Sequence, residues 1–361
     1  MTITAFKQPN AAPQHKDSLG YRAVKMLLTQ RIALLGLLTV AVLAVMVSLN
    51  SAGALSGSYD ADYLAAALIS AVPLAMLGLA ELMVILSGRG GIDLSVGAIV
   101  SLCGIVFGYS YGVWNLGLFL SILLTAAAGA LCGALNGFLV AYIGFPPLIA
   151  TLATFYAIKS LALIISGQKP ISTVQIQEFF SAAQSVEIPV IGQNLPNVPL
   201  GIFTFLIPTA ALVWLLLNRT TFGRRLFALG TNDVAAAWAG VDTRSNRMTA
   251  YVISGLISGL VAIVTVAQFA SARPDAGVSG NGMALPAITI AVLGGVAITG
   301  GIGRVSGILL ATLLVVWLNA GILLAFAGNE GTQFQLLALG LLLIGASLLN
   351  NLTRKKFGVL H

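Results

Sequence analysis

A few ionisable and amide side chains interrupt the long apolar segments of this chain, and these are the groups that could do chemistry inside a membrane. Glu81, Lys159 and Asn136 each stand within such a segment. Charged side chains are costly in hydrocarbon, so they usually face a water-filled path or a polar partner. We therefore treat the three residues as candidates for a translocation path. Two plainer alternatives stay open: Glu81 is solvated near a membrane surface, or Lys159 extends its ammonium group to the interface.

The sequence shows no set of residues typical of an enzyme. Its two histidines, His15 and His361, lie near the ends of the chain. Its two cysteines, Cys103 and Cys132, both fall in apolar segments, where they form neither a disulfide framework nor a metal-binding spacing. No lysine follows a phosphate-binding glycine pattern, so we expect that this chain does not hydrolyse ATP itself. We expect no cofactor and no metal, and ATP-driven transport would need a separate ATPase.

Composition indicates an all-α polytopic membrane protein. Of 361 residues, 58% are hydrophobic and only 8% are charged, whereas roughly a quarter of the residues are charged in soluble domains. The pattern predicts about ten transmembrane helices, each near the ~20 residues that cross a bilayer. We expect a transmembrane domain over 32–350, with tails at 1–31 and 351–361. The expected spans are 32–48, 63–87, 94–112, 115–142, 147–166, 199–217, 248–270, 283–300, 306–327 and 332–350. Span 115–142 is long, and we expect it to be tilted or to break at Gly129 or Gly133.

The distribution of lysine and arginine predicts the orientation of these spans. When the ten spans are threaded through a bilayer, all of the 18 basic residues except Lys159, Lys169 and Arg273 fall on the side of the N-terminus. The positive-inside rule then places both termini in the cytoplasm. The net charge of +7 is spread through these loops, so we assign it to topology and expect no nucleic-acid partner.

The longest outer segment, 167–198, is predicted to be a periplasmic loop. Phe179 and Phe180 would lie there on a short amphipathic helix. The segment is either a covering loop, or a gate or receptor for an external partner.

The basic segment from Arg219 to Arg247 carries a short alanine-rich run, Asp233 to Ala239, between Gly230 and Gly240. Thr231 or Asn232 can cap the start of this run, and Gly240 can end it in a left-handed conformation. One interpretation is a solvated cytoplasmic loop, and the other is a docking helix for a soluble partner. For docking, within a coupling loop at 218–247, the candidate residues are Gly230, Asn232, Asp233, Ala235, Ala236 and Gly240.

A glycine-rich segment separates the second and third spans. It reads GGIDLSVG, and its glycines permit positive φ and close backbone approach. Asp93 or Ser95 can cap the helix that follows. A second break at 300–304 echoes it on the same side. Gly129, Gly133 and Gly137 have the small-xxx-small spacing that lets membrane helices pack closely. The candidate residues of the glycine motif are Gly90, Gly91, Ile92, Asp93, Leu94, Ser95 and Gly97.

These motifs resemble those of the ribose/branched-chain-amino-acid type permeases of bacterial ABC importers. The resemblance covers essentially 32–350, in the family's order. It rests on GGIDLSVG at 90–97, PPLIATL at 146–152, TFGR at 221–224 with ALGTN at 228–232 and the alanines at 235–236, SARPDAG at 271–277, and LGG at 293–295.

The resemblance implies ten helices per subunit in a type II ABC importer-like fold. It also implies an inner-membrane location and a dimer, with an identical or a different second permease subunit. The partners that it implies are a cytoplasmic ATP-binding subunit, a periplasmic sugar-binding protein and membrane lipid. By this resemblance, the helix near Asp233 to Ala239 would insert into a cleft of the ATPase.

The sequence also departs from the family pattern. Arg89 sits in an apparent insertion before the glycine motif, Glu81 replaces a residue that is usually uncharged, and Lys159 stands where sugar permeases often have arginine. The run MALPAI at 283–288, continued by Thr289, resembles that of the autoinducer-2 (Lsr-type) permeases.

The expected solute is accordingly a monosaccharide similar to ribose, xylose or rhamnose, with autoinducer 2 as the alternative. Two alternatives of another class stay open: an ion-coupled secondary sugar transporter, whose coupling groups would lie near the membrane midplane, and a membrane subunit without transport activity.

Overall fold

The computed structural model describes residues 30–183, 185–186, 197–279, 282–326 and 328–357. The expected N-terminal tail and part of the predicted periplasmic loop fall outside these residues. The described chain is almost entirely helical, with a two-stranded sheet formed by β1 (Ser185–Val186) and β2 (Val198–Pro199). This confirms the predicted all-α class.

The helices of the first half include three π-helical turns, η1, η2 and η3, that continue or begin longer helices. In chain order they are α2 (Arg31–Ser51), α3 (Ala61–Leu86), α4 (Val96–Phe107), η1 (Gly108–Val113), α5 (Leu118–Phe138), η2 (Leu139–Ile143), α6 (Pro147–Ser166), α7 (Val174–Ala182), η3 (Ile202–Leu206) and α8 (Ile207–Arg219).

The second half of the chain begins with two short helices. Its elements are α9 (Thr221–Thr231), α10 (Asp233–Trp238), α11 (Thr243–Phe269), α12 (Ala284–Leu293), α13 (Val305–Ala325) and α14 (Asn329–Phe357).

Nine helical segments of the described chain are long and apolar enough to cross a membrane, while the expected span at 283–300 is shorter than predicted. Only α12 is helical there, with 10 residues, and at ~1.5 Å per residue it covers about half of the hydrocarbon thickness. Gly295, Gly300 and Gly301 have φ of +90°, +95° and +74°. These left-handed glycines end the helix although the apolar composition continues.

Two further boundaries differ from the predictions. Helix α14 runs to Phe357, through much of the expected C-terminal tail. Helix α5 passes through Gly129 and Gly133 without a break, and its irregular part is the π-helical turn η2 that follows it.

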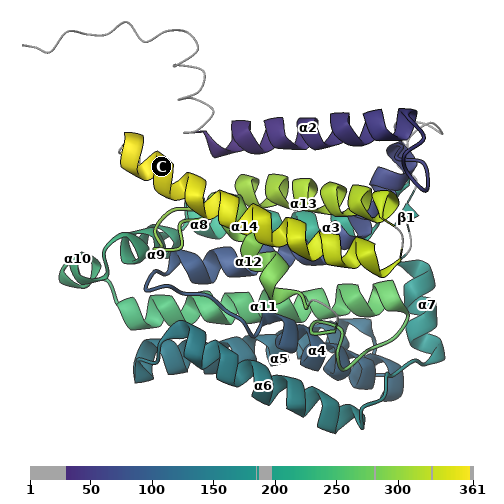
Figure 1. The fold of residues 1–361 in the computed structure, drawn as a ribbon. Helices are drawn as coiled ribbons and strands as arrows, with labels where there is room; N and C mark the ends of the chain where they lie inside the picture. The colour runs from purple at the N-terminus through teal and green to yellow at the C-terminus, as the bar shows by residue number, and fades with distance from the viewer. Residues whose placement is uncertain (1–29, 184, 187–196, 280–281, 327, 358–361) are drawn as a thin grey trace, which may run out of the picture.

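The bundle has a buried centre and an exposed outer layer. Helix α3 lies in the middle, between the layer of α2, α13 and α14 and the layer of α11, α5 and α6 (Figure 1). The helical segments of α3, α4 and α11 are mostly buried, whereas α2, α5, α6, α8 and α14 expose most of their surface.

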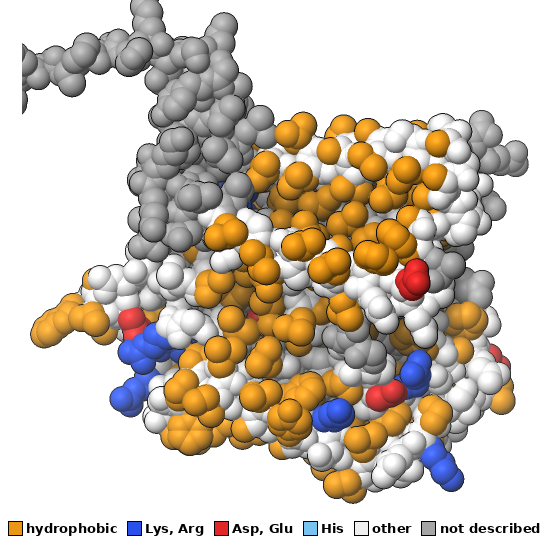
Figure 2. Space-filling model, in the orientation of Figure 1, with side chains coloured by type: hydrophobic (Ala, Val, Ile, Leu, Met, Phe, Trp, Pro, Cys, Tyr) orange, Lys and Arg blue, Asp and Glu red, His pale blue; other side chains and the backbone are white. Residues whose placement is uncertain are grey.

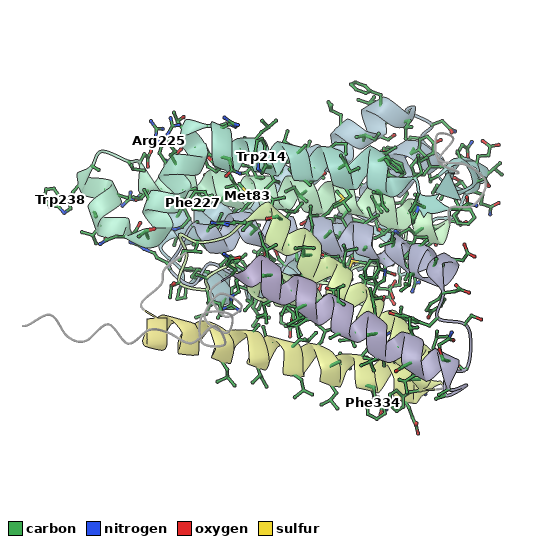
Figure 3. The ribbon with its side chains drawn as sticks, turned by 90° about the horizontal axis from the view of Figure 1, so that it is seen from above. Met83, Trp214, Arg225, Phe227, Trp238 and Phe334 are labelled. Atoms are coloured by element: carbon green, nitrogen blue, oxygen red, sulfur yellow. The ribbon has the colours of Figure 1, made fainter. Side chains whose placement is uncertain are left out.

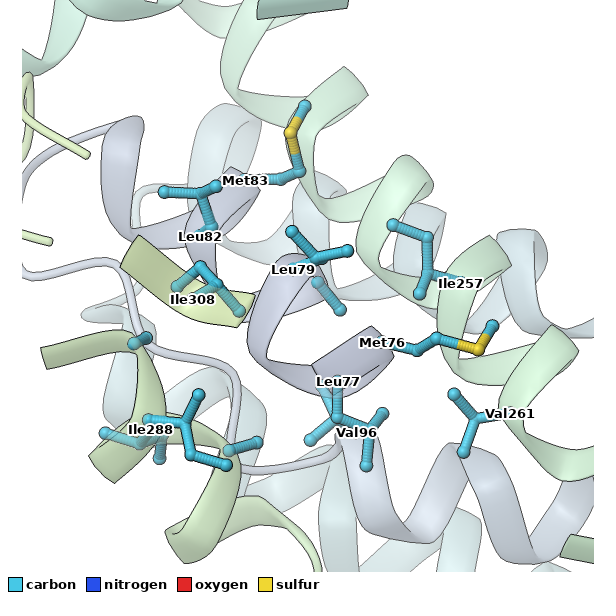
Figure 4. Close-up of a cluster of buried hydrophobic side chains, with 14 of the residues drawn as sticks. Met76, Leu77, Leu79, Leu82, Met83, Val96, Ile257, Val261, Ile288 and Ile308 are labelled. Atoms are coloured by element: carbon cyan, nitrogen blue, oxygen red, sulfur yellow. The ribbon is translucent and has the colours of Figure 1, made fainter. Parts of the chain in front are cut away.

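Side chains of α3 form the centre of the core, as Figure 4 shows. Its Met76 and Leu79 lie close to Ile257 and Val261 of α11, and α12 and α13 contribute Ile288 and Ile308. These residues are all less than a tenth exposed.

Small residues permit the close packing of α5 on α11. A Cβ atom added to Gly133 would lie 3.1 Å from Gly255 Cα and would collide with the backbone of Tyr251. Lipid chains are as apolar as leucine, so helices associate in a membrane largely through such close contacts. The small-xxx-small prediction for α5 is therefore confirmed.

The two ends of the bundle differ from its apolar middle. Helix α10 lies at one end and α7 at the other (Figure 1), and we call these the α10 end and the α7 end. On the face drawn in Figure 2, hydrophobic side chains dominate the region between them. Helix α7 contains Phe179 and Phe180, as the sequence predicted for a short helix in this segment.

Candidate functional site at the α10 end

Three capped helix starts divide the basic segment into α9, α10 and α11. Thr220 Oγ1 accepts a hydrogen bond from the Gly223 amide at 3.2 Å, Asn232 Oδ1 from Ala235 at 3.0 Å and Asp242 Oδ1 from Ser245 at 3.0 Å. Each bond satisfies an amide that the first turn of a helix leaves free.

The end of α10 also has the predicted geometry, because Gly240 follows the helix with φ of +80°. Of the two predicted caps, Asn232 caps α10, whereas Thr231 bonds back to Phe227 in α9.

Helix α10 presents apolar side chains to solvent. Ala236 is buried and packs α10 onto the protein, while Val234 is 65% and Trp238 88% exposed. Trp238 projects from the far end of α10, away from the bundle (Figure 3). Sequence analysis missed both exposed residues, although a tryptophan in an otherwise polar loop was a usable signal.

A hollow of about 400 Å³ lies beside α10. Its lining combines a charged side with an apolar side, and consists of Arg89, Asp233, Val234, Ala237, Trp238, Gly240 and Thr243.

Three glycine segments meet at the α10 end, below this hollow. The Gly301 amide donates to the carbonyl of Leu86 at 3.2 Å. A Cβ atom on Gly88 would lie 3.0 Å from Gly230 Cα, and one on Gly300 would lie 2.5 Å from Gly88 Cα. Gly230 therefore serves close backbone approach. The breaks at 88–91 and 300–304, which the sequence shows as echoes of each other, lie in contact.

The glycine motif continues from this contact into the buried interior. Gly91 sits too close to the Val84 carbonyl for a side chain, and Gly97 packs against the backbone of Gly277. Gly90 has φ of +66°. Ile92 and Leu94 pack against the core.

Asp93 is the centre of a buried hydrogen-bond network. Its Oδ1 accepts from the Ser95 amide at 2.9 Å and from the Ser95 hydroxyl at 2.6 Å. The Asn136 amide nitrogen lies 3.3 Å from each Asp93 oxygen and 2.7 Å from Ser95 Oγ. Burial raises the pKa of the Asp93 carboxyl, and the hydrogen bonds from Ser95 and Asn136 oppose this rise.

Two more helices join the same network. Thr154 Oγ1 in α6 donates to Asn136 Oδ1 at 2.6 Å, and the Asp93 amide donates to Glu81 Oε2 in α3 at 3.3 Å. Glu81, Asp93, Ser95 and Asn136 are fully buried, so Glu81 is not solvated at a membrane surface. The network ties α3, α5 and α6 to the start of α4. Sequence analysis missed Thr154, because threonine is common in membrane helices and carries no charge.

The third candidate for the path, Lys159, lies apart from Glu81 and Asn136. It is half-buried on α6, and its Nζ lies 5.8 Å from the centre of the Phe155 ring. Among the described residues it forms no ion pair.

A larger cavity of about 1050 Å³ opens toward the α7 end. Segments of α3, α5, α7, η3, α8 and α11 line it, with Phe179, Phe180, Phe205, Asp62 and Gln268 among its residues. Glu81, Asp93, Asn136 and Lys159 are not part of this lining.

Comparisons with known proteins agree with this architecture. The family model described as "Branched-chain amino acid transport system / permease component" matches residues 63–348. No solved structure matches the chain.

Similar proteins include autoinducer 2 import system permease proteins LsrD. The protein of Yersinia enterocolitica is 36% identical over 248 residues, which cover 69% of this chain and 72% of the relative. That of Klebsiella pneumoniae is 37% identical over 253 residues, with 69% and 72% covered. That of Salmonella typhimurium is 34% identical over 250 residues, with the same coverage. With its family match across most of the helical bundle, this chain belongs to the permease components of the branched-chain amino acid transport system family.

Proposed function

We propose that this chain is the membrane permease subunit of an ATP-driven importer of the inner membrane, and that a separate ATPase docks on α10. The observation that carries the proposal is the capped helix α10, which presents Val234 and Trp238 to solvent beyond the apolar bundle. Exposed apolar side chains of this kind mark a surface for a partner protein.

The arrangement of α9, α10 and α11 suits mechanical coupling. Helix α10 is short and packs against α9 and α11, and α11 in turn packs along α3, α4 and α5. A movement of α10 by the ATPase would therefore reach the centre of the bundle. Packed helices respond to such a push by changing between discrete arrangements, which is what alternating access requires.

The basic residues support a cytoplasmic position for the α10 end. Arg219, Arg224, Arg225 and Arg244 lie there, on or beside α9 and α10, and cytoplasmic loops are rich in such residues. We place the α7 end in the periplasm, with the cavity of about 1050 Å³ as the entrance for a solute delivered by a binding protein. A second permease subunit, identical or different, would complete the path.

We propose autoinducer 2, a furanosyl signal, as the leading solute. The relatives named above are autoinducer 2 permeases and share more than a third of their aligned residues with this chain. This reverses the order expected from the sequence, in which a monosaccharide came first. A ribose-like sugar is the second candidate, since the family motifs are common to both.

The test is purification of the chain from native membranes in mild detergent, as wild type and with Trp238→Ala. We expect an ATPase with the wild type and a loss of at least about tenfold with Trp238→Ala, because an exposed aromatic anchor often dominates a docking surface. The matched control is Trp214→Ala on α8, where the indole is 43% exposed but lies on a membrane-length helix.

Uptake into proteoliposomes then separates the solutes, with autoinducer 2 and ribose as probes together with any binding protein that copurifies. Recovery of the chain without an ATPase, with uptake driven by an ion gradient, would reject the importer in favour of a secondary transporter.

A further inference from the structure

Asp233, the first residue of α10, lies between two arginines from different parts of the bundle. Arg89 Nη2 is in direct contact with Asp233 Oδ2, and Arg247 Nη2 lies 3.1 Å from Asp233 Oδ1. Arg89 belongs to the loop after α3, and Arg247 belongs to α11. The side chain of Asp233 is only 17% exposed, so it faces the protein and not a partner.

The two ion pairs have different surroundings. The Arg247 guanidinium is only 2% exposed, and its Nη2 also donates to the Ser87 carbonyl at 3.2 Å. A buried charge depends strongly on its partner, whereas an exposed pair contributes little by itself. Arg247 therefore provides the strong connection, from α10 both to α11 and to the end of α3. Arg89, which is 61% exposed, adds a weaker connection to the same carboxylate.

The backbone at Arg89 indicates that its side chain is used. Its φ is +55°, between Gly88 at +76° and Gly90 at +66°. Glycine adopts this left-handed region without penalty, whereas a residue with a Cβ atom pays about 1 kcal/mol or more. An arginine at such a position is explained by its contact with Asp233. Arg89 is also the residue that departs from the family pattern.

The loop that holds Arg89 leads directly to the buried network. Its backbone touches Gly230 at the end of α9 and Gly300 before α13, and four residues after Arg89 the chain reaches Asp93. Asp93 is connected to α3, α5 and α6 through Glu81, Asn136 and Thr154. A displacement of Asp233 would consequently move the loop together with three spanning helices.

We propose that Asp233, held by Arg89 and Arg247, is the positioning residue that transmits the movement of α10 to the glycine loop at 87–95. The proposal rests on the proposed function, because it takes α10 as the site where the ATPase docks. It adds a division of labour: Val234 and Trp238 bind the partner, and Asp233 passes the movement inward.

The experiment compares Asp233→Asn, Arg89→Gln and the double variant with the wild-type complex in proteoliposomes. The readouts are ATPase recovery, ATP hydrolysis, and solute imported per ATP, with autoinducer 2 or ribose, whichever the wild-type complex imports. Arg89→Lys tests rescue by a conserved charge. Arg244→Gln is the matched control, since Arg244 is exposed in the same segment and has no ion pair among the described residues.

We expect Asp233→Asn to keep the ATPase and its hydrolysis, while solute imported per ATP falls about tenfold, the upper range for a coupling residue. Arg89→Gln should have a smaller effect, the double variant should resemble Asp233→Asn, and Arg89→Lys and Arg244→Gln should resemble wild type. A residue that only stabilises the fold would lower the amount of complex and leave the ratio unchanged.

An unchanged ratio in Asp233→Asn would overturn the proposal. Loss of the ATPase in that variant to the extent seen with Trp238→Ala would also overturn it, because Asp233 would then be part of the docking surface. Failure of the proposed function is a different result, visible before any substitution: the wild-type chain would bring no ATPase with it.

Discussion

At the scale of single residues, the interior of this protein holds its polar groups by pairing each with a neighbour from another helix. Asp93 receives bonds from Ser95 and Asn136, and Asn136 in turn accepts from Thr154. Removing one partner from a buried polar pair costs more than the pair contributes, because the remaining group stays buried without a bond. The network should therefore be sensitive at its uncharged members too.

Thr154→Val tests this sensitivity. The substitution preserves shape and leaves Asn136 Oδ1 without its 2.6 Å donor, so we expect a loss of about 1–3 kcal/mol in stability. Thr312→Val is the matched control, since Thr312 is equally buried but bonds to Ile308 of its own helix. Thermal unfolding in detergent measures both. Equal losses in the two variants would show that the network adds nothing beyond local bonding.

At the scale of elements, glycine decides how closely two helices approach. Helices α5 and α11 make backbone contact at Gly129, Gly133 and Gly255. Helix α14 also contains glycine, but a Cβ atom at Gly340 would meet nothing within 4 Å. The same residue type therefore has a packing role in one helix and none in the other.

Gly133→Ala and Gly340→Ala make this contrast measurable. In α5 the added methyl group must push α11 away, and overpacking of this kind costs typically about 1–3 kcal/mol. In α14 the same change should be neutral or stabilising by up to about 1 kcal/mol, since alanine favours helix more than glycine does. Unfolding temperatures of the purified variants decide the matter, and a stable Gly133→Ala protein would argue against the tight contact of α5 with α11.

At the scale of the whole molecule, the two ends of the bundle have different equipment. The α10 end carries most of the described arginines and an exposed tryptophan, while the α7 end carries the large cavity and a short amphipathic helix. We assign the first end to the cytoplasm by the positive-inside rule.

Two single-cysteine variants test this orientation with matched sites. Val174→Cys at the start of α7 and Val234→Cys in α10 replace valines that are 67% and 65% exposed. A membrane-impermeant maleimide added to intact spheroplasts should label the Val174→Cys variant only, and added to inverted vesicles the Val234→Cys variant only. The wild-type chain is the control for Cys103 and Cys132. Labelling from the opposite sides would invert the topology and with it the assignment of α10.

Local chemistry determined much that the sequence predicted correctly. Long apolar runs specify membrane helices because the uncharged backbone must satisfy its own hydrogen bonds in lipid. Caps are equally local: Asn232 and Gly240 delimit α10 through bonds and torsion angles within a few residues. The family, too, followed from short motifs in their order along the chain.

Tertiary structure decided the rest, because it depends on contacts between distant segments. The shortness of α12 follows from glycine torsions and from the close contact of Gly294 with Gly307, although its composition suits a full span. The network joins Glu81, Asp93 and Asn136 but leaves Lys159 aside, a distinction that intramembrane charge alone does not reveal. Similarly, Asp233 and Arg247 are 14 residues apart and Arg89 is far earlier in the chain. Their meeting at one carboxylate exists only once α3, α10 and α11 have packed.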